Sequence, residues 1–152
     1  MKRILFLHGL ESKPGGSKAL YLKSLGYEVL NPLLPANNFS KSLEIAQEAL
    51  DKKPDVIVGS SRGGALALSL KSHNVPMILI APAWKKFGAG SNARSGTVIL
   101  HSEADDVVSF EDTQELFRSN IGIELIACGE SHRMNDPDAL HHLFDAIERL
   151  IG

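Results

Sequence analysis

A serine flanked by glycines stands where an apolar run of the sequence gives way to an Ala/Leu-rich stretch. The segment Gly59-Ser60-Ser61-Arg62-Gly63-Gly64 contains the pattern Gly-x-Ser-x-Gly, with Ser61 at its centre. A sharp turn here would hold the serine oxygen out at the edge of a sheet, while the glycines let strand and helix pass closely. The same pattern also fits a tightly packed turn, or a phosphate site at a helix N-terminus. The pattern therefore has to be weighed together with its surroundings.

A serine hydroxyl becomes a nucleophile at neutral pH only beside a general base, and that base needs an acid to orient it. The loop after residue 127 contains a histidine, His132, and the loop after residue 101 is acidic. Both loops follow apolar runs, so in a parallel sheet they would lie on the same edge as Ser61. The sequence therefore predicts a nucleophile, a base and an acid on three separate strand ends. The acidic candidates are Glu103, Asp105 and Asp106.

The elements that would position these residues alternate regularly along the chain. Several apolar runs are continuously apolar, as strands buried on both faces are. Alternation of strand and helix predicts a parallel sheet with right-handed crossovers and helices on both faces. We expect one three-layer α/β domain over residues 1–152. The expected strands are 3–8, 27–30, 55–60, 77–80, 97–101 and 122–127, and the expected helices are 17–25, 40–52, 61–73, 110–119 and 137–150.

Three helix ends carry residues that favour them. Asp136 followed by Pro137 fits an N-cap and a first helical position. Ser109 is a candidate N-cap for the fourth helix, and Gly26 is a candidate C-cap for the first.

Taken together, these motifs resemble the α/β-hydrolase superfamily, in particular its short bacterial serine esterases without a cap domain. Leu7-His8-Gly9-Leu10 resembles the oxyanion loop, and residues 59–64 resemble the nucleophile elbow. Residues 101–108 resemble the H-G-x-x-D-x-V-V acid loop, and residues 129–132 resemble the G-x-x-H loop. The resemblance spans residues 4–150. It departs from the common pattern at Arg62, Ser102 and Ser109, none of which removes a catalytic group.

The resemblance implies acyl transfer on a minimal, mostly or fully parallel six-stranded sheet in the order 2-1-3-4-5-6. Ser61 would attack a carbonyl, His132 would take and return the proton, and Asp105 would orient the imidazole. The backbone N–H groups of Leu10 and Arg62 would form the oxyanion hole. No cofactor and no metal is implied. Because the family's oxyanion loop follows its third strand, two leading strands and the cap are expected to be absent, leaving an open site.

Other residues compete for the same roles. Ser60 is the alternative nucleophile, although it lacks the flanking glycine spacing. Asp106 and Glu103 are alternatives to Asp105 as the orienting acid. Packing roles are expected for His8, His101 and Cys128.

The substrate is less clearly indicated than the reaction. A small carboxylic ester is the expected substrate, a thioester on a protein or carrier is the alternative, and a non-catalytic binding scaffold is the rival from another class. Clustered basic residues would favour substrates with an anionic portion. The candidate pocket walls, for which ordinary loop packing is the alternative, are Trp84, Phe87 and Met134, and the basic residues are Arg62, Lys85, Lys86, Arg94 and Arg133.

Composition excludes several classes of protein and partner. The chain has 152 residues, of which 43% are hydrophobic and 22% charged, with a net charge of −2. These values are ordinary for a globular protein and exclude a coiled coil, a collagen and a disordered chain. The basic residues form no stripe, no apolar run approaches the ~20 residues of a membrane span, and no phosphate-loop motif occurs. We therefore predict no nucleic-acid, membrane or nucleotide partner, and the single cysteine suits a cytoplasmic protein.

Overall fold

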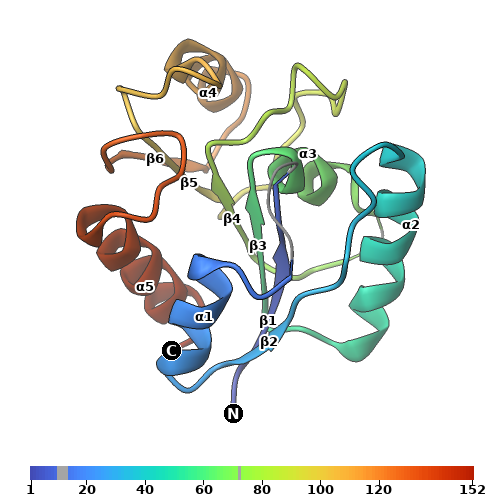
Figure 1. The fold of residues 1–152 in the computed structure, drawn as a ribbon. Coiled ribbons are helices and arrows are strands. Elements are labelled where there is room, and N and C mark those ends of the chain that lie inside the picture. Colours follow the sequence, from blue (N-terminus) through green and yellow to red (C-terminus); the bar gives the residue numbers. More distant parts are fainter. Residues whose placement is uncertain (10–13, 72) are drawn as a thin grey trace.

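Strands and helices alternate along the chain, as the apolar runs predict (Figure 1). The computed structural model describes residues 1–9, 14–71 and 73–152. The strands are β1 (Arg3–Leu7), β2 (Glu28–Leu30), β3 (Val56–Ser60), β4 (Met77–Ile80), β5 (Val98–His101) and β6 (Glu124–Ala127). The helices are α1 (Ser17–Ser24), α2 (Phe39–Ala49), α3 (Arg62–Ser69), α4 (Phe110–Arg118) and α5 (Pro137–Ile151), with a 3-10 turn η1 (Leu50–Lys52).

The six strands form one sheet in the order β2-β1-β3-β4-β5-β6, and every neighbouring pair is parallel. This confirms the predicted strand order. β1 pairs with β2 and β3, so that Leu5 lies between Leu30 and Ile57. Because all strands run in the same direction, the loops after β1, β3, β5 and β6 reach the same edge of the sheet.

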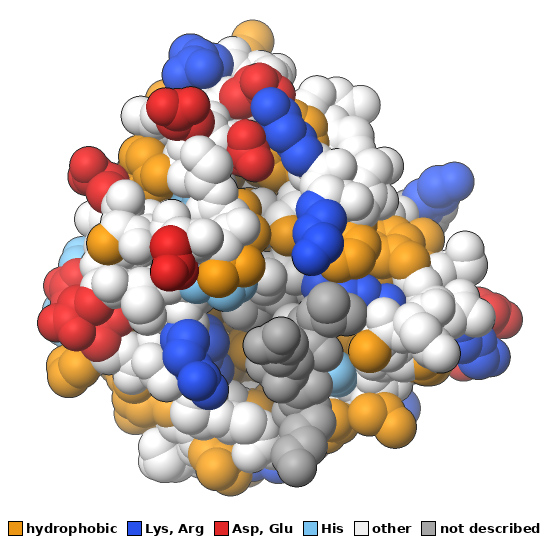
Figure 2. Space-filling model, turned by 45° about the horizontal axis from the view of Figure 1, so that its top comes forward, with side chains coloured by type: hydrophobic (Ala, Val, Ile, Leu, Met, Phe, Trp, Pro, Cys, Tyr) orange, Lys and Arg blue, Asp and Glu red, His pale blue; other side chains and the backbone are white. Residues whose placement is uncertain are grey.

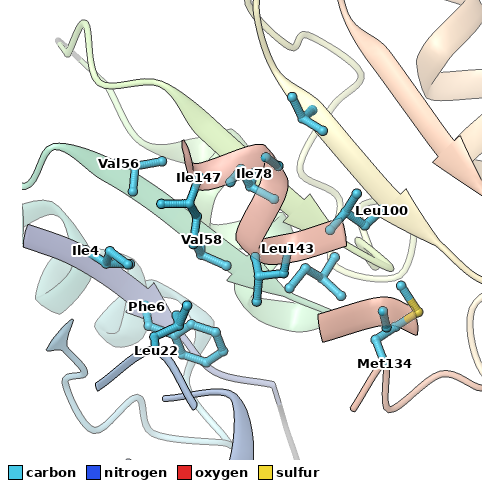
Figure 3. Close-up of a cluster of buried hydrophobic side chains, with 14 of the residues drawn as sticks. Ile4, Phe6, Leu22, Val56, Val58, Ile78, Leu100, Met134, Leu143 and Ile147 are labelled. Atoms are coloured by element: carbon cyan, nitrogen blue, oxygen red, sulfur yellow. The ribbon is translucent and has the colours of Figure 1, made fainter. Parts of the chain in front are cut away.

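Helices cover both faces of the sheet, and successive strand residues point to opposite faces. The first core cluster lies between the sheet and α1 and α5, where Leu143 and Ile147 of α5 pack on Val58 and Ile78 (Figure 3). The second core cluster lies on the other face, under α2, α3 and α4. It receives the alternate residues of each strand, such as Leu5, Leu7, Ile57, Leu79 and Ile99.

The predicted helix caps are present. The side chain of Asp136 accepts a hydrogen bond from the Ala139 N–H at 3.1 Å, and the Ser109 hydroxyl accepts one from the Glu111 N–H at 3.2 Å. Gly26, with φ +95°, follows the end of α1. Within the described ranges, no helix combines the length and apolar character needed to cross a membrane.

Helix α3 is shorter than predicted, because it ends at Ser69 and not at residue 73. The backbone of Lys71 pairs instead with the side chain of Gln47 in α2. The Gln47 amide donates to the Lys71 carbonyl at 2.9 Å and accepts from the Lys71 N–H at 3.0 Å. A side chain of another helix therefore takes the backbone groups that a continued α3 would have used, and Leu70 is extended and buried.

Candidate active site

Ser61 lies on the turn between β3 and α3 in a backbone conformation that L-residues rarely adopt. Its φ is +56° and its ψ is −113°. The turn is held by backbone hydrogen bonds: the Ser61 N–H donates to the Ile80 carbonyl at 2.8 Å, and the Ser61 carbonyl accepts from the N–H groups of Gly64 at 2.9 Å and Ala83 at 3.0 Å. Strain of this kind persists only where the surroundings enforce it, and it is common at functional sites.

The glycines around Ser61 are required by close backbone contacts. A Cβ atom on Gly63 would lie 1.9 Å from the carbonyl oxygen of Leu7 at the end of β1. A Cβ atom on Gly59 would lie 2.4 Å from the Gly63 carbonyl oxygen, and one on Gly64 would lie 2.8 Å from Cβ of Pro82. The start of α3 can therefore approach β1 and β4 only with glycine at these positions.

The structure brings Ser61, His132 and Asp105 together. His132 Nε2 lies 3.0 Å from Ser61 Oγ, and His132 Nδ1 lies 2.7 Å from Asp105 Oδ2. The Asp105 side chain is fully buried, whereas 19% of the His132 side chain remains exposed. With the Nδ1–H donating to the carboxylate, Nε2 is free to accept the serine proton.

Asp105 is held by backbone donors as well as by His132. Its Oδ1 accepts hydrogen bonds from the N–H groups of Val107 and Val108, both at 2.8 Å. Burial alone would raise the pKa of Asp105, but the hydrogen bonds from His132 and from these backbone groups outweigh it and hold the pKa below its ordinary value. The competing acids Asp106 and Glu103 are exposed. Ser60, the competing nucleophile, ends β3 and is buried.

The loop that carries His132 is fixed by three side chains, two from the start of α5 and one from the loop after β5. Asp136 and Asp138 accept hydrogen bonds from its backbone at Glu130 and Gly129. The Ser102 hydroxyl of the acid loop donates to the Gly129 carbonyl at 3.0 Å. These contacts fix the position of His132 relative to Asp105 and Ser61.

Lys18 of α1 is a residue that sequence reasoning missed. Its ammonium donates to the Arg133 carbonyl at 2.6 Å, directly after His132. Burial, with the nearby positive charge of Arg133, lowers the pKa of Lys18 to about 8. A lysine more than one hundred positions away in the chain carries no sequence signal of this contact.

Of the two N–H groups proposed for the oxyanion hole, the one of Arg62 belongs to the described part of the chain. The N–H of Arg62 opens α3, and no hydrogen bond among the described residues uses it. Leu10 lies outside the described residues. His8, two positions before Leu10, is buried. Its Nδ1 donates to the Gly9 carbonyl at 2.9 Å, and its Nε2 accepts from the Leu34 N–H at 3.1 Å.

The side chain of Arg62 is buried, with 1% of its surface exposed. One guanidinium nitrogen, Nη2, donates to the Pro35 carbonyl at 2.9 Å and to the Ser42 hydroxyl at 3.2 Å. The guanidinium carbon lies 5.5 Å from the ring centre of Phe39 and 5.7 Å from that of Phe87, and the two rings stack on each other. Nε and Nη1 have no hydrogen-bond partner in the described part of the chain. Burial lowers the pKa of this group.

The three candidate pocket walls have different surroundings. Trp84 packs in the second core cluster, where its indole N–H donates to the Asp112 carbonyl at 3.0 Å. Met134 is 2% exposed and belongs to the first core cluster. Phe87 is half-buried beside Arg62. Phe87 is therefore the member of the set with a surface that solvent can reach.

The basic residues do not all gather at one place, although Arg62 and Lys86 both lie over the ring of Phe87. Lys85 forms ion pairs with Asp112 and Glu115. Arg94 lines a cavity of about 380 Å³ with residues at the far end of α3, whereas a smaller cavity of about 40 Å³ lies beside Ser60 and Lys18. Figure 2 shows a hollow on the face at the carboxyl ends of the strands, with basic, apolar and histidine side chains around it.

Metal ligands do not cluster in the described ranges, where no group of three or more His, Cys, Asp or Glu side chains could hold an ion. Cys128 is buried, and burial raises the pKa of its thiol to about 11, with the charges of Asp138 and Asp136 adding to the shift.

Comparison with protein-family models finds no match, and comparison with curated proteins finds none either. Solved structures do match. A protein of Agrobacterium vitis S4 named as a candidate hydrolase is 21% identical, with a TM-score of 0.79 over 99% of this chain and 88% of its own. The α/β-hydrolase domain-containing protein 10 from mouse is 18% identical, with a TM-score of 0.76 over 98% and 89%. An esterase from Exiguobacterium antarcticum is 15% identical, with a TM-score of 0.73 over 99% and 91%. These similarities show that the chain has the α/β-hydrolase fold.

Proposed function

We propose that the protein is a serine hydrolase that cleaves small carboxylic esters through an acyl-enzyme intermediate. The observation that carries this proposal is the hydrogen-bonded series Ser61, His132, Asp105, with distances of 3.0 and 2.7 Å, on a strained strand-to-helix turn. The fold shared with named hydrolases and an esterase supports the reaction class.

The geometry suits a two-step acyl transfer. Ser61 Oγ attacks the ester carbonyl while its proton passes to His132 Nε2, and Asp105 stabilises the imidazolium that forms. The Arg62 N–H would bind the developing oxyanion, an interaction worth roughly 3 kcal/mol per donor. The C–O bond to the leaving group then breaks and His132 returns the proton to that oxygen. In the second step water attacks the acyl carbonyl while its proton passes to His132. The bond between the acyl carbon and Ser61 Oγ then breaks, and His132 returns the proton to Oγ.

Fluorophosphonate labelling tests the nucleophile directly, because these probes react with activated serines. Wild type is expected to be labelled, and Ser61→Ala and His132→Ala are expected not to be. Ser60→Ala is the matched control, since it removes a hydroxyl from the adjacent residue and should keep full labelling. Absence of labelling in the folded wild type would favour the binding-scaffold alternative.

Kinetics on a panel of esters and thioesters of varied chain length and charge tests the substrate class. The expected result is turnover of short esters that falls by roughly 10⁴-fold or more in Ser61→Ala. Faster turnover of thioesters than of the matched esters would transfer the assignment to a thioesterase.

A further inference from the structure

A second histidine, His101, contacts the orienting acid of the candidate triad. It ends β5 and is completely buried. Its Nε2 lies 2.9 Å from Asp105 Oδ2 and 3.1 Å from the Val108 carbonyl oxygen. Its Nδ1 lies 2.7 Å from the hydroxyl of Thr113 in α4, and its ring meets that of Phe110 edge-on.

These partners determine where the ring carries its proton. Burial lowers the pKa of His101, although the neighbouring carboxylate acts in the opposite direction, so the ring is neutral near pH 7. A neutral imidazole donates from one nitrogen and accepts at the other. Nε2 faces a carboxylate and a carbonyl, which only accept, so Nε2 carries the hydrogen. Nδ1 then accepts a hydrogen bond from the Thr113 hydroxyl.

Asp105 Oδ2 therefore receives N–H groups from two imidazoles, at 2.9 Å from His101 and 2.7 Å from His132. The result is one continuous series of hydrogen bonds from Thr113 through His101, Asp105 and His132 to Ser61. We propose that His101 is a positioning residue for the reaction. It holds the buried carboxylate in place and shares its negative charge, so that less of that charge acts on the imidazole of His132. The proposal rests on the serine-hydrolase function proposed above.

The expected consequence has a definite direction. Without the His101 donor, more of the negative charge on Oδ2 faces His132, and the imidazolium form of His132 is stabilised. The ascending limb of kcat/KM against pH, which reports the loss of that proton in the free enzyme, should move upward by about half to one pH unit. Loss of the fixed carboxylate orientation should also lower the plateau by about tenfold.

Other titratable groups lie around Asp105 and His132, and the substitutions at His101 leave them unchanged. Ser61 faces Nε2 of His132. Arg133 follows His132, with the Lys18 ammonium on its carbonyl oxygen. In the acid loop, Asp106 and Glu103 are exposed, and Cys128, Glu130, Asp136 and Asp138 belong to the segment that follows β6.

Two substitutions separate positioning from packing. His101→Leu fills the site with an apolar side chain and removes the Nε2–H donor to Asp105. His101→Gln places an amide N–H near the position of ring Nε2, and an amide does not titrate. The limb should shift in the Leu variant and return to within roughly 0.2 pH unit of wild type in the Gln variant. Rates are normalised to active sites counted by fluorophosphonate labelling, so partial unfolding does not enter.

Nitrogen-15 NMR of the imidazoles gives a test that needs no turnover. Wild-type His101 should show a protonated Nε2 and an unprotonated Nδ1, and the His132 titration should move upward in His101→Leu. An Nδ1–H tautomer in wild type, or an unmoved His132 titration in a folded Leu variant, overturns the proposal. These NMR signals exist without catalysis. Absence of esterase activity would therefore count against the proposed function, while the role of His101 would still be decided by the NMR result.

Discussion

The strained backbone at Ser61 should cost the protein stability that a glycine would recover. Ser61→Ala and Ser61→Gly both remove the hydroxyl and its hydrogen bond to His132, so the difference between them isolates the effect of the Cβ atom. The φ of +56° and ψ of −113° fall in a region that essentially only glycine occupies without strain. We therefore expect the Gly variant to be the more stable of the two.

The magnitude follows from two opposing terms. A residue held in such a region costs on the order of 1–3 kcal/mol. Glycine loses more backbone entropy on folding than alanine, which offsets about 0.5–1 kcal/mol of the gain. The Gly variant should exceed the Ala variant by about 1–2 kcal/mol in free energy of unfolding, or by roughly 3–6 °C in Tm for a chain of this size.

Urea denaturation of both variants measures this difference, provided their m values agree. Lys53 supplies the matched control, because it is exposed and has an ordinary left-handed conformation, with φ 55° and ψ 61°. Lys53→Gly should exceed Lys53→Ala by a smaller amount, roughly 0.5–1 kcal/mol. A Ser61→Gly variant no more stable than Ser61→Ala would refute the strain argument.

Three further measurements test other parts of the structure. Gly63→Ala should lower the free energy of unfolding by about 1–3 kcal/mol, because its Cβ atom would meet the Leu7 carbonyl oxygen at 1.9 Å. Arg62→Met should leave stability unchanged or raise it, because it removes a buried guanidinium with two nitrogens unpaired among the described residues. The stability advantage of wild type over Asp105→Asn should shrink as the pH falls below about 4, because the charged carboxylate has a lower pKa in the folded state than in the unfolded one. Urea unfolding followed by circular dichroism serves for all three.

Each of these has a result that would contradict it. A Gly63→Ala variant as stable as the wild type would contradict the contact with β1. A loss above about 2 kcal/mol in Arg62→Met would show that the hydrogen bonds from Nη2 outweigh burial of the charge. A stability advantage of wild type over Asp105→Asn that grows as the pH falls would contradict a lower pKa of Asp105 in the folded state.

The order of the elements, and the loops that carry the candidate triad, could be predicted from the sequence for a physical reason. Continuously apolar runs have to be strands buried on both faces, and alternation with helices makes those strands parallel. Parallel strands bring their carboxyl ends to one edge, which places Ser61, His132 and the acidic loop after residue 101 together before any contact is known. The close approaches that require Gly59 and Gly63 follow from the same turn.

Contacts between distant segments were not predictable in the same way. The sequence predicts α3 to continue to residue 73, but Gln47 takes the backbone of Lys71. It offers Trp84 as a pocket wall, and the packing of α4 buries that ring. In both places the partner lies more than 20 residues away, at a distance that local pattern does not encode.

The sequence by itself determines the alternation of strands and helices, and with it a parallel sheet whose carboxyl edge carries the candidate residues, because periodicity and glycine spacing act locally. The strand order and the choice of Asp105 among the acidic candidates came from the resemblance to the α/β hydrolases. The tertiary structure decides which further hydrogen bonds form around these residues. Two histidines share one oxygen of Asp105, and a lysine of α1 holds the loop that carries His132. The His132–Asp105 and Lys18–Arg133 hydrogen bonds join residues 27 and 115 positions apart, so they form only when packing brings distant parts of the chain to within 3 Å. The His101–Asp105 contact lies within one loop, and it is the arrival of His132 that makes the two histidines share one oxygen.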